Sequence, residues 1–293
     1  MIPRPIDHLV LPVDSLKAAR ARYEALGFQV REDRQHPFGT ANCCIFFQNQ
    51  TYLEPLAVAD REKAEAAIVD GNIFVRRQDA YRFRHGEGCA MLALTSEDAD
   101  ADQATFAGEG YAAGPVYAFE RKASRADGSE TTICVRLAYA IDHRAPDAMI
   151  FACQHLNPDA LRDPASFDHG NGALGVTGVY MVETNPADFQ YYLEATTGQR
   201  AIRASSLGIE ADTPNGIVAI LTLDGVNALF GLSNVATTRG PRLCAFTLAA
   251  KNLDAVAKRL DDQGIDHRRQ AGRLIVDPAP GQGVLIAFEE AAK

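Results

Sequence analysis

The sequence has no excess of basic residues. Asp and Glu outnumber Lys and Arg by 38 to 29, which gives a formal net charge of −9. Proteins that bind nucleic acids gain most of their affinity from a basic face, so this balance argues against such a partner. It also disfavours anionic membrane surfaces, while a local basic pocket can still hold a small anion. We therefore expect a small-molecule substrate, no nucleic-acid partner and no membrane partner.

CxxC motifs and long apolar runs are also absent. The six cysteines include no CxxC pair, and most of them lie in apolar runs, so we expect buried free thiols in a reducing compartment. The apolar stretch near the N-terminus is short and is broken by Pro12 and Asp14, which is typical of neither a signal peptide nor a membrane span. We expect a cytoplasmic protein.

Several common catalytic motifs are missing as well. The sequence contains no G-x-S-x-G elbow, no P-loop and no G-x-G-x-x-G after a strand. Apolar residues make up 47% of the 293 residues and charged residues 23%, as in ordinary soluble globular proteins. This length predicts roughly two domains.

What the sequence does contain is a repeated order of strand, helix and three further strands. In the first copy, residues 5–58, a β-branched run precedes a helix-like segment that ends at Gly27. The same order returns three times, with helices that end at Gly110, Gly198 and Gly264, as glycine C-caps predict. The repeats are too long for a solenoid and favour small α+β modules that pair to close a curved sheet.

Two segments fall outside this repeat. Residues 59–87 form an insertion, in which residues 58–72 favour a helix and residues 76–88 a polar connection. Residues 156–173 are rich in Pro, Gly, Asn and Asp, which indicates a linker. We therefore predict three parts: an N-terminal domain over residues 1–160, a linker over 161–173 and a C-terminal domain over 174–293.

Short motifs in the N-terminal half carry a family resemblance. The strand IDHLVLPV leads into the first helix, and the turn HPFGTAN at residues 36–42 precedes a YLE strand at 52–54. Arg125-x-Asp127-Gly128 and the segment 151–159 complete the set. With these motifs the chain resembles the vicinal oxygen chelate superfamily, and within it the bacterial glyoxalase-like domain family. The resemblance implies an α+β fold of four βαβββ modules in paired curved mixed sheets, as in glyoxalases, bleomycin resistance proteins and extradiol dioxygenases.

The resemblance also implies a metal site in the N-terminal half. Metal ligands in this superfamily lie on the first and fourth strands of paired modules, which places His8, Glu54 and His155 in a set of two histidines and one carboxylate. The metal would be Zn, Fe, Mn or Ni. A register shift of one residue would replace His155 with Gln154. A metal-free polar pocket and a purely structural role remain alternatives for His8 and Glu54.

Strand alternation supports a concave-side position for His8. It sends Ile6, His8 and Val10 to one face of the strand, and it sends Asp7 and the leucines that follow to the face that suits the helix. On the last strand of the second module, Met149, Phe151, Cys153 and His155 share one face.

Four further residues are predicted to bind substrate near the mouth of the cavity: His36, Asn42, Tyr52 and Arg121. His36 and Asn42 lie in a turn of a kind that often rims cavities, and a plain turn is the alternative. Arg121 belongs to a local basic cluster with Lys122 and Arg125 that suits a carboxylate or phosphate, and a solvated hairpin face is the alternative.

The C-terminal half lacks the ligand pattern. Gly178 or Val179 and Ala245 occupy the positions equivalent to His8, and Glu289 near the Glu54 position cannot hold a metal alone. We interpret this half as a degenerate, structural or dimer-forming copy, so a homodimer is an open option.

The leading hypothesis is a divalent-metal-dependent lyase or isomerase in which the metal chelates two adjacent oxygens of a small substrate and Glu54 is catalytic. A ring-cleaving dioxygenase and a metal-free small-molecule binding or resistance protein are the alternatives. The fold does not choose among these reactions.

Overall fold

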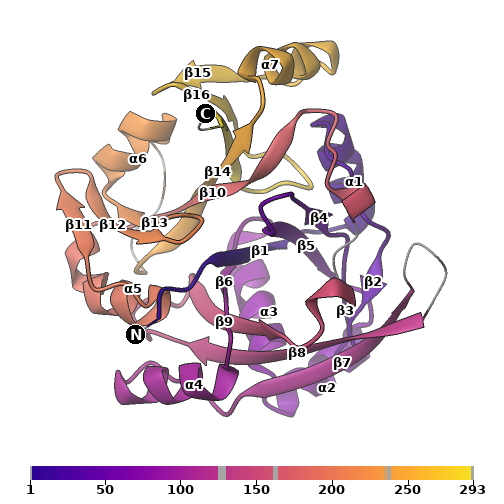
Figure 1. The fold of residues 1–293 in the computed structure, drawn as a ribbon, viewed down its shortest axis with the longest axis vertical. Coiled ribbons are helices and arrows are strands. Elements are labelled where there is room, and N and C mark those ends of the chain that lie inside the picture. Colours follow the sequence, from indigo (N-terminus) through magenta and orange to yellow (C-terminus); the bar gives the residue numbers. More distant parts are fainter. Residues whose placement is uncertain (1, 125–129, 161–163, 234, 236–238, 292–293) are drawn as a thin grey trace.

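The computed structural model describes residues 2–124, 130–160, 164–233, 235 and 239–291 (Figure 1). Arg125, Asp127 and Gly128, which contribute to the family resemblance, lie outside the described residues. No described helix is long and apolar enough to cross a membrane.

Two curved mixed sheets form the scaffold, which confirms the predicted α+β fold. The strands of the first sheet follow the order β2 (Arg34–Gln35), β3 (Thr40–Asn42), β5 (Tyr52–Val58), β1 (Ile6–Pro12), β6 (Met91–Thr95), β9 (Met149–His155), β8 (Glu130–Ala140) and β7 (Tyr117–Ser124), and β4 (Ile45–Phe46) pairs with β5. Those of the second follow the order β11 (Ile202–Ser205), β12 (Gly208–Thr213), β13 (Gly216–Leu221), β10 (Ala173–Val182), β14 (Arg242–Ala250), β17 (Leu285–Glu290), β16 (Arg273–Val276) and β15 (Arg268–Gln270).

Each sheet joins two modules through their first strands. The antiparallel pairs β1–β6 and β10–β14 make these joints, and within each module the first strand also pairs in parallel with the last. The predicted module helices are present as α1 (Leu16–Ala25), α4 (Ala99–Gly108), α5 (Gln190–Thr197) after the short η3 (Pro186–Phe189), and α7 (Leu253–Asp262). The short helices η1 (Pro158–Ala160) and η2 (Pro164–Ser166) flank residues 161–163.

The insertion forms two helices, α2 (Arg61–Val69) and α3 (Ile73–His85). The second one corrects the polar connection predicted over residues 76–88. Phe74, Gln78 and Tyr81 are buried at helical spacing, so an Arg-rich segment still has one face that packs inward. The side chain of Asn72 accepts a hydrogen bond from the amide of Val75 and caps the helix. The insertion therefore covers part of the first sheet.

A helix that the sequence analysis missed covers the corresponding face of the second sheet. Helix α6 (Leu223–Phe230) packs Val226 and Phe230 against Tyr180, Val182 and neighbouring apolar side chains of that sheet. Because α6 occupies the face that corresponds to the pocket side of the first sheet, the C-terminal half has the packing expected for a structural role.

The two sheets share one hydrophobic core. Phe28 stacks on Phe288 with ring centroids 6.1 Å apart, and the hydroxyl of Tyr192 accepts a hydrogen bond from the amide of Ile150 and donates one to the carbonyl of Ala140. The first sheet takes its strands from residues 6–155 and the second from residues 173–290. The domain division proposed from the sequence stays a prediction, because this core spans it.

Candidate functional site

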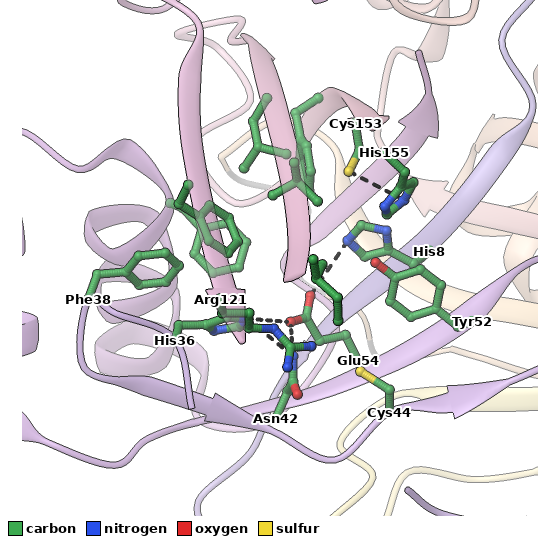
Figure 2. A pocket seen from close by; sticks show the side chains of 16 residues that line it. His8, His36, Phe38, Asn42, Cys44, Tyr52, Glu54, Arg121, Cys153 and His155 are labelled. Carbon is green, nitrogen blue, oxygen red and sulfur yellow. Dashed lines mark hydrogen bonds and ion pairs between the residues drawn. The ribbon is translucent and has the colours of Figure 1, made fainter. Parts of the chain in front are cut away.

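A pocket lies on the face of the first sheet that faces the insertion (Figure 2). About 50 Å³ of it is open to water-sized molecules, which is enough for ordered water to enter. Its apolar wall comes from α3 of the insertion, the turn that carries Phe38 and the last three strands of the second module. Polar side chains from β1, β3, β5, β7, β9 and the turn before β3 converge at its other end: His8, His36, Asn42, Glu54, Arg121 and His155.

A β-bulge in β1 determines which of its residues reach this pocket. The pairing of β1 with β6 shifts register between Ile6 and His8. As a result Ile6 belongs to the core shared by the two sheets, whereas His8 lines the pocket. Simple alternation had placed Ile6 and His8 on one face, and the bulge corrects this. Asp7 contacts His8 instead of pointing to the helix side.

Asp7 links two histidines of the pocket. Its Oδ2 lies 2.6 Å from Nδ1 of His8 and 3.0 Å from Nε2 of His155. Burial by itself would raise the pKa of Asp7, but the charges and hydrogen bonds of His155 and His8 outweigh it and hold the pKa well below its usual range. The carboxylate therefore accepts the Nδ1 hydrogen of His8, which leaves Nε2 of that ring directed toward Glu54.

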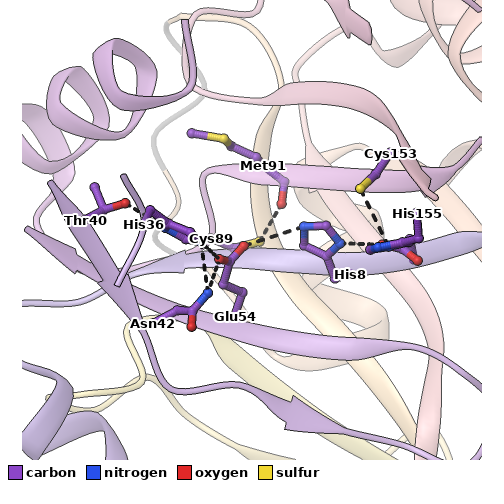
Figure 3. Close-up of polar contacts among 10 residues, drawn as sticks. His8, His36, Thr40, Asn42, Glu54, Cys89, Met91, Cys153 and His155 are labelled. Carbon is purple, nitrogen blue, oxygen red and sulfur yellow. Dashed lines mark hydrogen bonds and ion pairs between the residues drawn. The ribbon is translucent and has the colours of Figure 1, made fainter. Parts of the chain in front are cut away.

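Glu54 is held by the strand and turn that precede it (Figure 3). Asn42 donates from Nδ2 to Glu54 Oε1 at 2.6 Å and lies 3.2 Å from Nε2 of His36. Nε2 of His8 lies 3.5 Å from Oε2 of Glu54, and Nε2 of His36 lies 3.6 Å from Oε1. Asn42 thus holds the carboxylate through Oε1, and Oε2 faces the ring of His8.

His36 is neutral at pH 7, because burial lowers its pKa to about 4. Its Nδ1 lies 2.8 Å from the hydroxyl of Thr40. With the Nδ1 hydrogen donated to Thr40, Nε2 accepts from the amide of Asn42. The turn is therefore part of the polar end of the pocket.

Tyr52 and Arg121 complete the predicted substrate-binding set. The ring of Tyr52 stacks on His8 with centroids 4.3 Å apart and an interplanar angle of 16°, so it fixes the orientation of the imidazole. Arg121 lines the pocket from β7. No described acidic side chain forms an ion pair with Arg121, so its charge is available to an anionic group.

His155, and not Gln154, faces the pocket. The side chain of Gln154 donates to the carbonyl of Glu97 at 2.7 Å and accepts from the amide of Ala99 at 3.3 Å, beside the start of α4. His155 lies 3.6 Å from the sulfur of Cys153. Burial opposes a charge on His155, but Cys153 and Asp7 outweigh it and raise its pKa well above the ordinary value.

The structure thus brings all seven predicted site residues to one pocket, in which the described contacts of His155 are with Asp7 and Cys153 rather than with Glu54. In the described part of the chain, the group of three ligand atoms within 4.8 Å of one another comes from Asp7, Cys153 and His155. Nδ1 of His155 is buried and has no hydrogen-bond partner among the described residues. Sequence reasoning missed Asp7, for which the one signal was a carboxylate inside a strand of buried residues.

The equivalent region of the second sheet is closed by its own ion pair. Arg273 donates from Nε to Glu289 at 2.9 Å, and Thr177 donates to the same carboxylate at 2.6 Å. Glu289 therefore has partners within the sheet.

Comparisons with known proteins agree with this fold. The profile of a family described as "Glyoxalase-like domain" matches residues 6–197. No curated protein gives a match. A hypothetical protein from Staphylococcus aureus is 13% identical, with a TM-score of 0.67, and the match covers 99% of this chain and 100% of that one.

Two solved structures of named enzymes are also similar. A mutant of 4-hydroxymandelate synthase from Streptomyces coelicolor is 11% identical, with a TM-score of 0.54, over 100% of this chain and 95% of that one. The Mn(II)-bound glyoxalase from Novosphingobium aromaticivorans is 14% identical, with a TM-score of 0.52, over 98% and 82%. At such identities these structures show a shared fold.

Proposed function

The chain belongs to the glyoxalase-like domain family, and from this we propose that it is a divalent-metal-dependent lyase or isomerase acting on a small substrate with two adjacent oxygens. One observation carries the proposal. A group of three potential ligands, Asp7, Cys153 and His155, lies beside a histidine–carboxylate pair, His8 and Glu54, that lines the pocket.

The donor atoms of this group fit a metal. Thiolate, imidazole and carboxylate together suit zinc first, and iron or nickel next. Cys153 and His155 line the pocket, which would leave a coordination position for substrate. The nitrogen of His155 in this group is Nε2, which lies 3.0 Å from Asp7 and 3.6 Å from the sulfur of Cys153. His8, Glu54 and His155, the set predicted from the sequence, form the second candidate.

A divalent metal supplies Lewis-acid stabilisation of negative charge on substrate oxygens. The chain supplies the remaining functions. Glu54, held by Asn42, would take a proton from a carbon next to a substrate carbonyl, and His8 would pass it on. Arg121 would bind an anionic group of the substrate.

The metal proposal is tested by elemental analysis of protein purified without chelator and then loaded with zinc. We expect about one zinc per chain, lost in His155→Ala and Cys153→Ala. The matched control is Gln154→Ala, whose side chain points away from the pocket. Loss in Glu54→Gln with retention in Cys153→Ala would assign the sequence-predicted ligands. Absence of metal from every sample would overturn the proposal and favour a metal-free binding protein.

The reaction is tested separately by NMR in deuterium oxide, which follows exchange of the hydrogens beside the carbonyl in a panel of 2-oxo acids. We expect the wild type to catalyse exchange and Glu54→Gln to lose most of the rate, about 100-fold or more. Equal rates for the two proteins would exclude Glu54 as the base.

A further inference from the structure

A second, larger cavity lies next to the pocket, between the insertion and the β7–β8 hairpin. It has a volume of about 620 Å³, and its lining includes Ala67 of α2, Ile73 of α3, Pro115, Tyr117 and Tyr139. By comparison, the pocket leaves about 50 Å³ for water-sized molecules. The larger space is therefore the part of the site with room for the body of a ligand.

The two spaces share one continuous floor. Along β7, Phe119 and Arg121 line the pocket while Tyr117 lines the outer cavity. Along β8, Leu137 lines the pocket while Tyr139 lines the outer cavity, and Tyr117 pairs with Leu137 across the hairpin. Because side chains two residues apart on a strand point to the same side, one face of the hairpin leads from one space into the other.

Phe38 divides the two spaces and lines both of them. Its ring stacks on His36 with centroids 4.9 Å apart, and it packs edge-on against Phe119 at 5.2 Å and Phe74 at 5.8 Å. Figure 2 shows it beside His36 at the apolar side of the pocket. The following residue, Gly39, accepts hydrogen bonds from two amides at the start of the insertion, which fixes the turn that presents Phe38.

From this geometry we infer that the ligand spans both spaces: a polar head with adjacent oxygens occupies the pocket, and an apolar, ring-containing body passes Phe38 into the cavity built by the insertion. The head-group part rests on the proposed function. The outer cavity suits a ring because most of the side chains that line it are aromatic, proline, alanine or isoleucine, whereas Lys63, Asp70 and Asn72 form its polar part. Tyr139, whose buried hydroxyl has no hydrogen-bond partner among the described residues, also lines this cavity.

The test compares two probes by calorimetry: pyruvate, which has only the head, and 2-oxo-5-phenylpentanoate, which adds a ring on a flexible arm. For the wild type we expect the phenyl compound to bind at least tenfold tighter, because the ring leaves water. In Ala67→Trp, which fills the outer cavity, this gain should disappear while pyruvate binding is unchanged. Ala104→Trp, on the exposed side of α4, is the matched control and should keep the gain.

Equal affinities of the two probes for the wild type would overturn the inference. The inference would also be overturned if Ala67→Trp still bound the phenyl compound more tightly than pyruvate, or if the phenyl compound did not bind to the wild type. Metal content distinguishes this failure from failure of the proposed function. If the protein binds no metal but still binds the phenyl compound more tightly than pyruvate in an Ala67-dependent way, the proposed function fails and this inference stands. If it binds metal but binds both probes equally, this inference fails and the proposed function stands.

Discussion

Gly27 and Gly264 provide a matched pair of substitutions that measures how tightly the two halves are joined. Both follow a module helix and have positive φ, +95° and +63°. A Cβ at Gly264 would meet no atom within 4 Å, whereas at Gly27 it would lie 2.4 Å from Nε of Arg259 and 2.9 Å from Cβ of Asn171. Gly264→Ala therefore isolates the backbone cost, about 1 kcal/mol.

Gly27→Ala should cost more, because both neighbours come from beyond the first sheet and bind the end of α1. Arg259 donates to the carbonyl of Glu24 at 3.0 Å, and the side chain of Asn171 donates to the carbonyl of Leu26 at 2.9 Å. Displacing them would weaken two hydrogen bonds worth about 1 kcal/mol each. The expected total is about 3 kcal/mol.

The assay is urea unfolding of the wild type, Gly27→Ala, Gly264→Ala, Arg259→Ala and the double variant Gly27→Ala/Arg259→Ala. Removing Arg259 relieves the closest contact, so the double variant should lose less than the sum of its single changes. Equal losses for Gly27→Ala and Gly264→Ala would refute the reasoning, since they would mean that the contact between the halves carries no stability.

Two further predictions concern contacts between segments far apart in the sequence. Burial lowers the pKa of His169 from 6.5, and its neutral ring accepts from the amide of Gln29 and contacts the carbonyl of Phe46. As pH falls, His169 is therefore protonated in the unfolded chain before it is protonated in the folded protein. The free energy of unfolding should be highest above pH 6.5 and should fall as pH drops below it. The difference between the urea midpoints at pH 7.5 and pH 5.5 should be smaller in His169→Gln than in the wild type. Tyr192→Phe should cost about 1–3 kcal/mol, because it leaves the amide of Ile150 without its partner, and an unchanged urea midpoint would contradict this.

The candidate site was predictable to the extent that it depends on strand alternation. Met149, Phe151, Cys153 and His155 do share one face, because β9 is regular from end to end. Asp7 was not predictable, because a single bulge in β1 changed its direction, and pairing with β6 decides where that bulge falls.

The sequence by itself determined the order of elements and the repetition of the module, because hydrophobic periodicity, helix caps and helix-ending glycines are local signals. Helix α6 does carry local signals, an N-cap at Thr222 and a glycine at its C-terminal end, Gly231, and these could have revealed it. The Arg-rich helix α3 shows no clear apolar face in its sequence, and its buried side is apparent only where it packs on the first sheet. The contact of Asp7 with His155, 148 positions apart, and the partition made by Phe38 between two cavities were likewise decided only by tertiary structure. Both depend on the packing of distant strands, and no local pattern in the sequence encodes that packing.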